Sequence, residues 1–137
     1  MVLTPFVLPG ETVKVALEAE SPGLVRGLPT EIITRSPHRT TPPCPYFMAC
    51  GGCHYQHADY SAQVDLKQSI LREQLRRVGH IQFEGEIRVV TAQATEYRNR
   101  SQFHMENGQI GYFAEGTHAV VPIEKCLTSS PGINRAL

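Results

Sequence analysis

Four cysteines are the residues of this chain best suited to chemistry. Cys44, Cys50 and Cys53 follow one another in the spacing Cys-x5-Cys-x2-Cys, and Cys126 lies far downstream. Three close thiolates and one distant thiolate form a familiar ligand set for a cubane iron–sulfur cluster. One loop can wrap three corners of such a cluster, and a second element can close the fourth. The spacing therefore predicts a [4Fe–4S] cluster on these four residues.

The residues between the predicted ligands suit the same cluster. Gly51 and Gly52 have no side chain, so the backbone there can fold closely round a bulky inorganic core. Its N–H groups can then point at the cluster sulfurs, and such hydrogen bonds tune the reduction potential. Tyr46 and Phe47 add apolar bulk that would shield a cluster from water. Residues 41–58 are therefore predicted to form the cluster-binding loop.

Other fates of the four thiols remain open. A structural zinc site typically uses two Cys-x-x-Cys pairs or a Cys/His pair, and His54 and His57 lie close enough in sequence to replace the missing pair. Two disulfides would need an oxidising compartment, but the start of the chain lacks the basic segment of a signal peptide. Unrelated buried thiols would not explain three cysteines in one short segment. A small ferredoxin would have different gaps between its ligands.

The composition limits the size and class of the fold. The chain has 137 residues, 41% of them apolar, with ten prolines and no tryptophan, so we expect one ordinary domain or two very small ones. Thirteen basic residues balance thirteen acidic ones, which argues against a strongly cationic nucleic-acid module but permits a local RNA-binding patch. No apolar run reaches membrane-spanning length. We expect a cytoplasmic protein with no membrane partner.

Residues 1–40 are predicted to form a small β-rich piece. Apolar and polar residues alternate over residues 11–18, as in a strand with one solvated face. Ser21-Pro22-Gly23 indicates a turn, and residues 31–34 support a second strand. The pair Pro42-Pro43 ends regular structure before the cysteine loop.

Residues 59–79 carry the strongest helix signal. Asp59 is a plausible N-cap, and Gly79 suits the left-handed position just beyond a helix C-terminus. Between them, apolar residues recur at helical spacing. This stripe consists of Val64, Leu71, Leu75 and Val78. The other face is basic, and we interpret Arg72, Arg76 and Arg77 as a solvated surface.

The C-terminal part of the chain returns to strands. Residues 87–90 form a short β-branched run, and residues 98–105 and 109–113 flank Glu106-Asn107-Gly108. Asn-Gly accepts the positive φ angles of a type I′ turn, so this sequence predicts a hairpin. Residues 118–123 indicate a further strand, with Cys126 just beyond it. We therefore predict an α+β fold that is mainly β, with residues 59–137 forming a helix and a small antiparallel sheet.

Two groups of polar residues are candidates for RNA contact, because single-stranded RNA is held by stacking and by cations on its backbone. On a strand from residue 98 to residue 105, four of them would share one face: Arg98, Arg100, Gln102 and His104. An ordinary solvated strand face would look the same. The second group precedes the cysteines and consists of Arg35, His38 and Arg39. We interpret His57 as satisfying local backbone groups.

Four segments carry a family resemblance. Residues 43–57 read PCPYFMACGGCHYQH, and residues 36–39 read SPHR. Residues 97–104 read YRNRSQFH, and residues 111–126 read GYFAEGTHAVVPIEKC. All four resemble segments of the bacterial 23S rRNA (uracil-5-)-methyltransferases. Residues 36–39 resemble the end of the N-terminal TRAM domain and residues 43–57 the cluster signature. Residues 97–104 resemble the start of the central β domain, and residues 111–126 resemble the segment with the fourth ligand.

The resemblance implies a domain organisation. Members of this family have a five-stranded, OB-like TRAM barrel, a central β domain with the cluster, and a C-terminal Rossmann-like domain that binds S-adenosylmethionine. This chain begins inside the TRAM pattern and stops at Leu137, before a transferase domain would begin. The resemblance therefore implies a partial TRAM barrel over residues 1–40, a central domain over residues 59–137 and no catalytic domain.

The resemblance also implies a chemistry. In this family a cysteine thiolate adds to C6 of uracil, C5 takes a methyl group from S-adenosylmethionine, and a carboxylate removes the C5 proton. All four cysteines of this chain match ligand positions, so the chain alone is expected to be inactive, with S-adenosylmethionine bound only in the complete enzyme. The implied partner is 23S rRNA, because the tRNA-modifying relatives lack the cluster motif. No protein partner is indicated. The alternatives are a stand-alone zinc or iron–sulfur RNA-binding module and a small electron-transfer protein.

Overall fold

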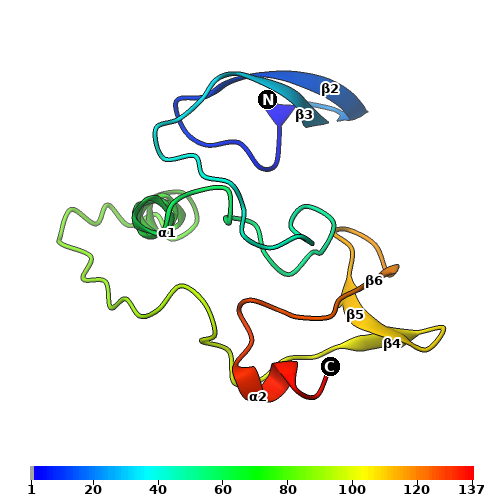
Figure 1. Ribbon diagram of the computed structural model, residues 1–137. Helices are drawn as coiled ribbons and strands as arrows, with labels where there is room; N and C mark the ends of the chain where they lie inside the picture. The colour runs from blue at the N-terminus through cyan, green and yellow to red at the C-terminus, as the bar shows by residue number, and fades with distance from the viewer. Residues whose placement is uncertain (1) are drawn as a thin grey trace. The chain divides into compact units, whose positions relative to one another are not determined.

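The computed structural model of the protein describes residues 2–137, apart from the side chains of residues 19–21. Within this range the chain forms two three-stranded sheets and two helices (Figure 1). The fold is α+β and mainly β, as predicted. Two compact units are present, Met1–Ala58 with Phe103–Ile123, and Asp59–Gln102 with Glu124–Leu137. The domain boundaries predicted at residues 40 and 58 stay predictions.

The first sheet belongs to the first unit. It contains β1 (Val2–Leu3), β2 (Thr12–Ser21) and β3 (Leu24–Thr34) in the order β1-β3-β2. The turn between β2 and β3 has Gly23 at a φ of +79°, which confirms the predicted turn. Both predicted strands are present, but β3 starts earlier than predicted, and the parallel pairing of β1 with β3 was not anticipated. In the described residues the sheet is open, as expected of a partial barrel.

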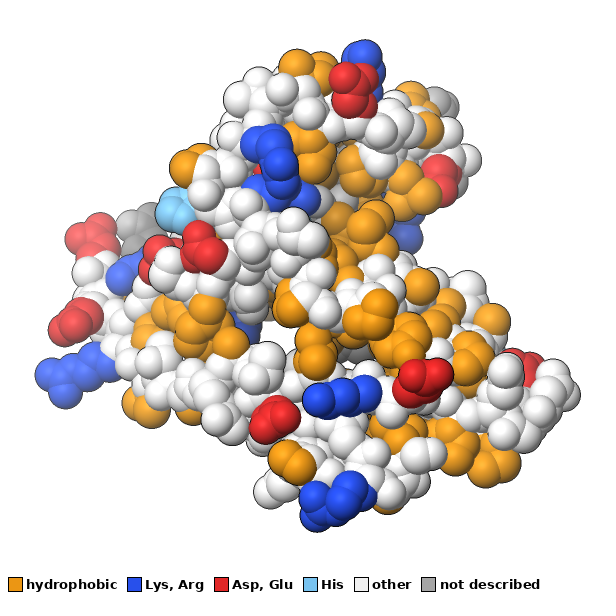
Figure 2. All heavy atoms as spheres, in the orientation of Figure 1, with side chains coloured by type: hydrophobic (Ala, Val, Ile, Leu, Met, Phe, Trp, Pro, Cys, Tyr) orange, Lys and Arg blue, Asp and Glu red, His pale blue; other side chains and the backbone are white. Residues whose placement is uncertain are grey.

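The hydrophobic core of the described residues is small. Figure 2 shows hydrophobic side chains spread over the visible surface. On the first sheet, for example, the side chains of Leu17 and Ile33 are more than half exposed, at 59% and 56%. The buried apolar residues are Leu8, Ala58, Ala62 and Ile123. Because so little apolar area is buried, specific polar contacts must account for a larger share of the stability.

The second sheet also belongs to the first unit. It contains β4 (His104–Glu106), β5 (Gln109–Phe113) and β6 (Val120–Pro122), all antiparallel, in the order β4-β5-β6. Between β4 and β5, Asn107 and Gly108 have φ angles of +52° and +79°. Both residues of the turn are therefore left-handed, as a type I′ turn requires. The predicted hairpin is confirmed.

The structure corrects two predicted strands in this part of the chain, one that is shorter than predicted and one that is absent. Strand β4 begins only at His104, and the residues before it form an isolated parallel bridge, Arg98 with Ser129, instead of a strand ladder. Residues 87–90 form no strand, and Val90 is 98% exposed. In both cases the sequence has a strand-like pattern, but the described chain offers no neighbouring strand with which to form a ladder.

The predicted helix is present as α1 (Tyr60–Arg77) in the second unit. Asp59 caps it, since its Oδ1 accepts a hydrogen bond from the Ala62 backbone N–H at 2.8 Å. The predicted apolar stripe is poorly covered, with Val78 at 72% exposure. The expectation of a left-handed Gly79 is wrong, because His80 takes that conformation with a φ of +53°. No helix of the described residues is both long and apolar enough to cross a membrane.

Replacing Asp59 with alanine is expected to destabilise the unit that contains α1 by about 1 kcal/mol, because the Ala62 N–H loses its acceptor. Urea unfolding followed by circular dichroism measures the effect. Asp59→Asn retains a capping oxygen and should restore most of the stability. Asp65→Ala is the matched control, because Asp65 is exposed within the helix and alanine is a better helix former. Equal destabilisation by Asp59→Ala and Asp65→Ala would contradict the cap.

Candidate functional site

The cysteine loop is closed at its base by backbone pairing. Arg39 and Ala58 form an antiparallel bridge, and the Thr40 N–H donates to the His57 carbonyl at 2.9 Å. The loop between them therefore starts and ends at one place. Inside it, the Cys50 N–H donates to the Tyr46 carbonyl at 2.8 Å in a tight turn. Backbone hydrogen bonds at its base and within it therefore stabilise the conformation of the loop.

The far side of the loop is fastened to strand β5. Cys50 bridges Ala114, and the Gly51 N–H donates to the Phe113 carbonyl at 2.9 Å. A Cβ atom at Gly51 would approach that carbonyl oxygen to 3.1 Å, which explains why a residue without a side chain is used here. The Gly52 N–H points at the Cys50 sulfur at 3.4 Å. This contact is the kind of N–H to sulfur hydrogen bond that the sequence predicts for the two glycines.

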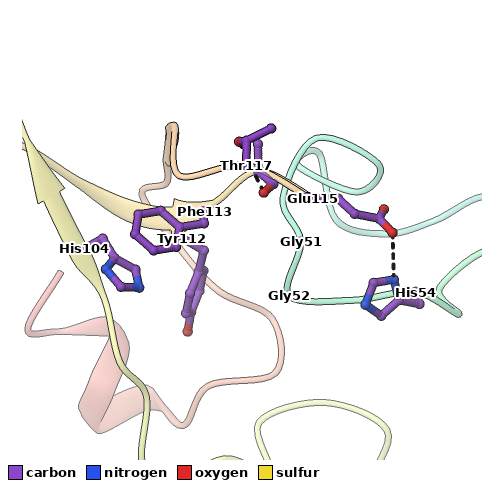
Figure 3. A pocket seen from close by; sticks show the side chains of 10 residues that line it. Gly51, Gly52, His54, His104, Tyr112, Phe113, Glu115 and Thr117 are labelled. Carbon is purple, nitrogen blue, oxygen red and sulfur yellow. Dashed lines mark hydrogen bonds and ion pairs between the residues drawn. The ribbon is translucent and has the colours of Figure 1, made fainter.

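An open hollow of about 470 Å3 lies beside the cysteine loop, within the first unit (Figure 3). Glycines 51 and 52 border it on one side, and β5 with the turn that follows borders it on the other. The ring of Phe113 stacks on that of His104, with centroids 3.6 Å apart. Glu115 and His54 form a more polar wall. The sequence indicates His104 as an RNA-contact residue and His54 as an alternative metal ligand. It does not indicate the aromatic wall, because these rings come from separate segments that meet only in the fold.

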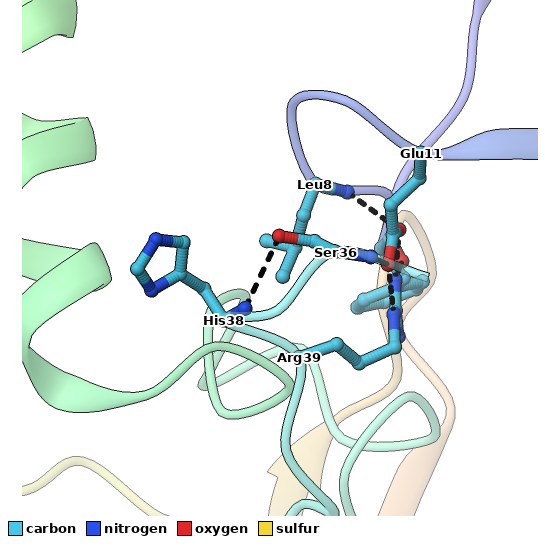
Figure 4. A network of polar contacts seen from close by, with 6 residues as sticks. Leu8, Glu11, Ser36, His38 and Arg39 are labelled. Atoms are coloured by element: carbon cyan, nitrogen blue, oxygen red, sulfur yellow. Dashed lines mark hydrogen bonds and ion pairs between the residues drawn. The ribbon is translucent and has the colours of Figure 1, made fainter. Parts of the chain in front are cut away.

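A buried polar network fixes the segment just before the loop (Figure 4). The side chain of Glu11 is fully buried, and its two oxygens accept hydrogen bonds from Nε and Nη2 of Arg39, whose side chain is 10% exposed. The same carboxylate accepts the backbone N–H groups of Leu8 at 2.9 Å and Ser36 at 3.1 Å. The Arg39 guanidinium lowers the pKa of Glu11 to about 2, outweighing the opposite effect of burial. Glu11 is thus a buried carboxylate with its charge compensated.

The network accounts for one of the three residues predicted to contact RNA ahead of the cysteines. Besides Glu11, the Arg39 guanidinium binds the Phe6 carbonyl at 2.8 Å. Its hydrogen bonds are made within the protein, so it has a structural role. Arg35 and His38 are exposed. They are the members of this group whose side chains can reach a ligand.

His57 lies at the base of the loop in an aromatic cluster. Its side chain is 3% exposed, and its ring centroid is 5.7 Å from that of Phe47 and 6.1 Å from that of Phe6. Neither ring nitrogen has a hydrogen-bond partner. The interpretation that this side chain satisfies local backbone groups is therefore wrong. Burial lowers the pKa of His57, and the nearby Arg39 charge lowers it further, so the ring is held in its neutral form.

Cys126 lies in the second unit, in a loop that is held by one asparagine. Asn134 Oδ1 accepts the Cys126 N–H at 2.8 Å, and its Nδ2 donates to the carbonyls of Cys126 and Ser129, each at 3.0 Å. Burial raises the pKa of the Cys126 thiol, but hydrogen bonds from Ser129 and Thr128 outweigh it and lower the pKa from 9.0 to about 7. The thiolate is the form that binds a metal. Asn134 belongs to helix α2 (Pro131–Asn134), which the sequence signal Ser130-Pro131 could have indicated.

The donor set of the four cysteines fits the predicted cluster chemically. All four are thiols and half-buried. One sulfur accepts a backbone N–H, and the pKa of another is lowered by its hydrogen bonds. Within residues 2–137 there is no group of three or more His, Cys, Asp or Glu side chains gathered round a single ion position.

The predicted RNA strip is divided by the fold. Arg98, Arg100 and Gln102 belong to the second unit, where the Arg98 N–H donates to the Thr128 carbonyl at 2.9 Å. His104 belongs to β4 of the first unit. Because the first three residues are not on a strand, the predicted alternation of faces does not apply to them. Arg100 and Gln102 are nevertheless exposed.

The curated proteins to which this chain is similar are RNA methyltransferases. No protein-family model matches the chain. An uncharacterised RNA methyltransferase of Aquifex aeolicus is 34% identical over 139 aligned residues, covering 99% of this chain and 32% of the relative. Another, from Nostoc, is 33% identical and matches 100% of this chain and 31% of the relative. The chain is homologous to part of these RNA methyltransferases. It spans about a third of their length.

A solved structure supports the same relationship with the RNA methyltransferases. The tRNA (uracil-54, C5)-methyltransferase of Pyrococcus abyssi, in complex with S-adenosyl-L-homocysteine, matches with a TM-score of 0.68 and 26% identity. The match covers 98% of this chain and 30% of that one. The described fold is therefore shared with part of that methyltransferase.

Proposed function

We propose that these residues form the RNA-binding, [4Fe–4S]-carrying part of an S-adenosylmethionine-dependent 23S rRNA uracil-C5 methyltransferase. The observation that carries the proposal is the match of nearly the whole chain to RNA methyltransferases, together with a solved neighbour that is a uracil C5 methyltransferase. The cysteine spacing favours the cluster-bearing class within that group. Transfer of the methyl group belongs to the whole protein.

The cluster would be held by Cys44, Cys50, Cys53 and Cys126, with the Gly52 N–H directed at one of the sulfurs. A bound cluster would supply a rigid cross-link between two distant segments of the chain. Methyl transfer by nucleophilic addition requires no electron, so a structural or RNA-positioning role is the simplest one. Because all four thiols are used as ligands in this proposal, we assign no catalytic residue to the chain and expect no methyl transfer by these 137 residues alone.

The RNA-contacting residues of the proposal come from both units. In the second unit they are Arg98, Arg100 and Gln102, on the segment bonded to the Cys126 loop. In the first unit they are Arg35, His38 and His104. Arg39 is left out because its guanidinium is buried against Glu11. The arginines among these residues would bind RNA phosphates without recognising the base sequence.

Replacing Arg98 and Arg100 together with glutamine is expected to weaken binding of single-stranded RNA and to reduce its salt dependence. Each phosphate contact that is lost should lower the slope of log K against log salt by about 0.7. Fluorescence anisotropy of a labelled RNA oligonucleotide, titrated at several salt concentrations, measures both quantities. Melting curves show whether the variant is folded.

The matched control removes the same charge from the solvated face of α1. Arg76 and Arg77 have exposed side chains beside Glu73, so the double glutamine variant there should bind RNA as the unaltered chain does. If both double variants lower the RNA affinity and the slope of log K against log salt equally, RNA binding is a general charge effect. The assignment of Arg98 and Arg100 is then wrong.

A tRNA is the second candidate substrate, because the solved neighbour is named as a tRNA methyltransferase. Mass spectrometry of nucleosides from a strain with the gene deleted separates the two. We expect 5-methyluridine to disappear from 23S rRNA and to persist in tRNA. The opposite result would replace rRNA by tRNA and leave the RNA methyltransferase assignment intact.

A further inference from the structure

The hollow beside the cysteine loop has a prearranged aromatic wall. Phe113 and His104 stack with an interplanar angle of 18°, and His118 contacts the edge of Phe113 at 5.3 Å between centroids. In Figure 3 the rings of His104, Tyr112 and Phe113 gather on the side of the hollow formed by β4 and β5. A ring fixed by its neighbours loses little conformational freedom when a second flat ring stacks on it. Such a wall is a platform for a planar ligand.

The opposite side of the hollow is flat and polar. Gly51 and Gly52 contribute backbone without side chains, and Glu115 lies beside them with its carboxylate 3.8 Å from Nδ1 of His54 (Figure 3). The side chains of Glu115 and His54 are about half exposed, so the carboxylate remains accessible to a ligand. A carboxylate accepts hydrogen bonds and donates none. The ligand edge that fits this wall therefore carries N–H groups.

The lining of the hollow excludes an anionic ligand. Among the described residues that line it there is no lysine and no arginine. A phosphate would face the Glu115 carboxylate with no fixed cation to compensate it. A volume of about 470 Å3 lies within the range of small-molecule sites. A neutral, planar group with amino hydrogens meets these conditions.

We propose that this hollow binds one unstacked nucleobase of single-stranded RNA. The base would stack on the platform of Phe113 and His104 and direct an amino-bearing edge at Glu115. Guanine, adenine and cytosine carry such an edge, whereas uracil has no amino group. The inference rests on the proposed RNA-binding function and adds a site that reads a base rather than the phosphate backbone.

Short uridine oligomers with one internal 2-aminopurine test the site. This base carries an amino group, its fluorescence is quenched by stacking, and the chain has no tryptophan to interfere. The chain is expected to quench the 2-aminopurine and to bind this oligomer roughly tenfold more tightly than one of uridine alone. Phe113→Leu removes the aromatic face but keeps apolar bulk, and should abolish quenching. Glu115→Ala, at an exposed position, removes both acceptor oxygens and should remove the preference for the amino-bearing oligomer while binding of the uridine oligomer is unchanged.

Two controls separate this site from general RNA binding. Phe83→Leu changes an exposed ring of the second unit and should leave quenching and affinity intact. The Arg98/Arg100 double variant should show a reduced salt dependence yet keep the preference for the amino-bearing base. If the unaltered chain binds both oligomers equally and without quenching, the base site is wrong although RNA binding stands. If it binds no RNA at all, the proposed function and the base site both fall.

Discussion

Replacing Glu11 with glutamine is expected to lower the free energy of unfolding by about 3 to 5 kcal/mol, which is the cost of breaking a buried ion pair by removing one partner. The carboxylate of Glu11 is fully buried, and Arg39 is nearly so. Glutamine retains the shape but leaves the Arg39 charge uncompensated. In a chain with so small a core, a loss of this size is expected to leave a large fraction of molecules unfolded. Urea titration with circular dichroism provides the measurement.

The exposed ion pair between Lys14 and Glu31 provides the matched control. It joins neighbouring strands at 2.6 Å, but its side chains are 63% and 57% exposed. Glu31→Gln is therefore expected to cost less than about 1 kcal/mol. Arg39→Met removes the other partner of the buried pair and should be as harmful as Glu11→Gln. A cost for Glu11→Gln no greater than that for Glu31→Gln would show that the buried pair contributes nothing to stability.

The lowered pKa of Glu11 predicts that the free energy of unfolding depends on pH. Its pKa is lowered from 4.5 to about 2 in the folded chain, so its stabilisation is complete above pH 4.5 and is lost as the pH falls towards 2. The shift corresponds to about 3 kcal/mol. The stability difference between the unaltered chain and Glu11→Gln should therefore shrink as the pH is lowered below 4.5. Burial lowers the pKa of His57 from 6.5, so its stabilisation is likewise lost as the pH falls below 6.5.

This pair matters beyond stability because of where it lies. Arg39, which Glu11 holds, pairs through its backbone with Ala58, and the adjacent Thr40 pairs with His57. These contacts close the base of the loop that carries Cys44, Cys50 and Cys53. Loosening them would free both ends of the segment that is proposed to wrap the cluster. We therefore interpret the Glu11 network as the support of the candidate site.

Local signals in the sequence predicted the elements that depend on local interactions. The Asn107-Gly108 turn needs only two residues that accept positive φ, and the cap at Asp59 needs only an oxygen placed before the helix. Both are present as predicted. The Gly79 prediction was wrong because the chain leaves α1 one residue later, where His80 takes the left-handed conformation.

Features that depend on distant partners could not be predicted in the same way. The pairing of Glu11 with Arg39 joins residues far apart in sequence, and no local pattern marks it. Residues 98–102 alternate like a strand, but they meet a loop at Ser129 instead of a neighbouring strand. The hollow brings His104 and Phe113 together with the cysteine loop only once β4 and β5 are formed. The cysteine spacing remains a prediction about ligand chemistry.

Replacing Cys126 with alanine is expected to remove most of the iron from chain that is prepared anaerobically. The unaltered chain should contain about four iron and four sulfide per chain. Without the fourth thiolate one iron lacks a protein ligand, and the cluster is expected to be lost. Ser130→Ala is the matched control, because it alters the same loop without removing a proposed ligand. Iron and sulfide assays on the three proteins give the comparison.

Stability measurements with and without the cluster separate a ligand from a packing residue. A cluster that binds only the folded chain stabilises the folded chain. Cys126→Ala should therefore be much less stable than the unaltered protein when the unaltered protein carries its cluster. After iron is removed from both, the two should differ only by the lost packing of a half-buried thiol and its hydrogen bond with Thr128. An unaltered iron content in Cys126→Ala would remove this residue from the ligand set. Colourless chain with one zinc would instead favour a structural zinc site on the cysteine loop, since zinc binds as a single ion.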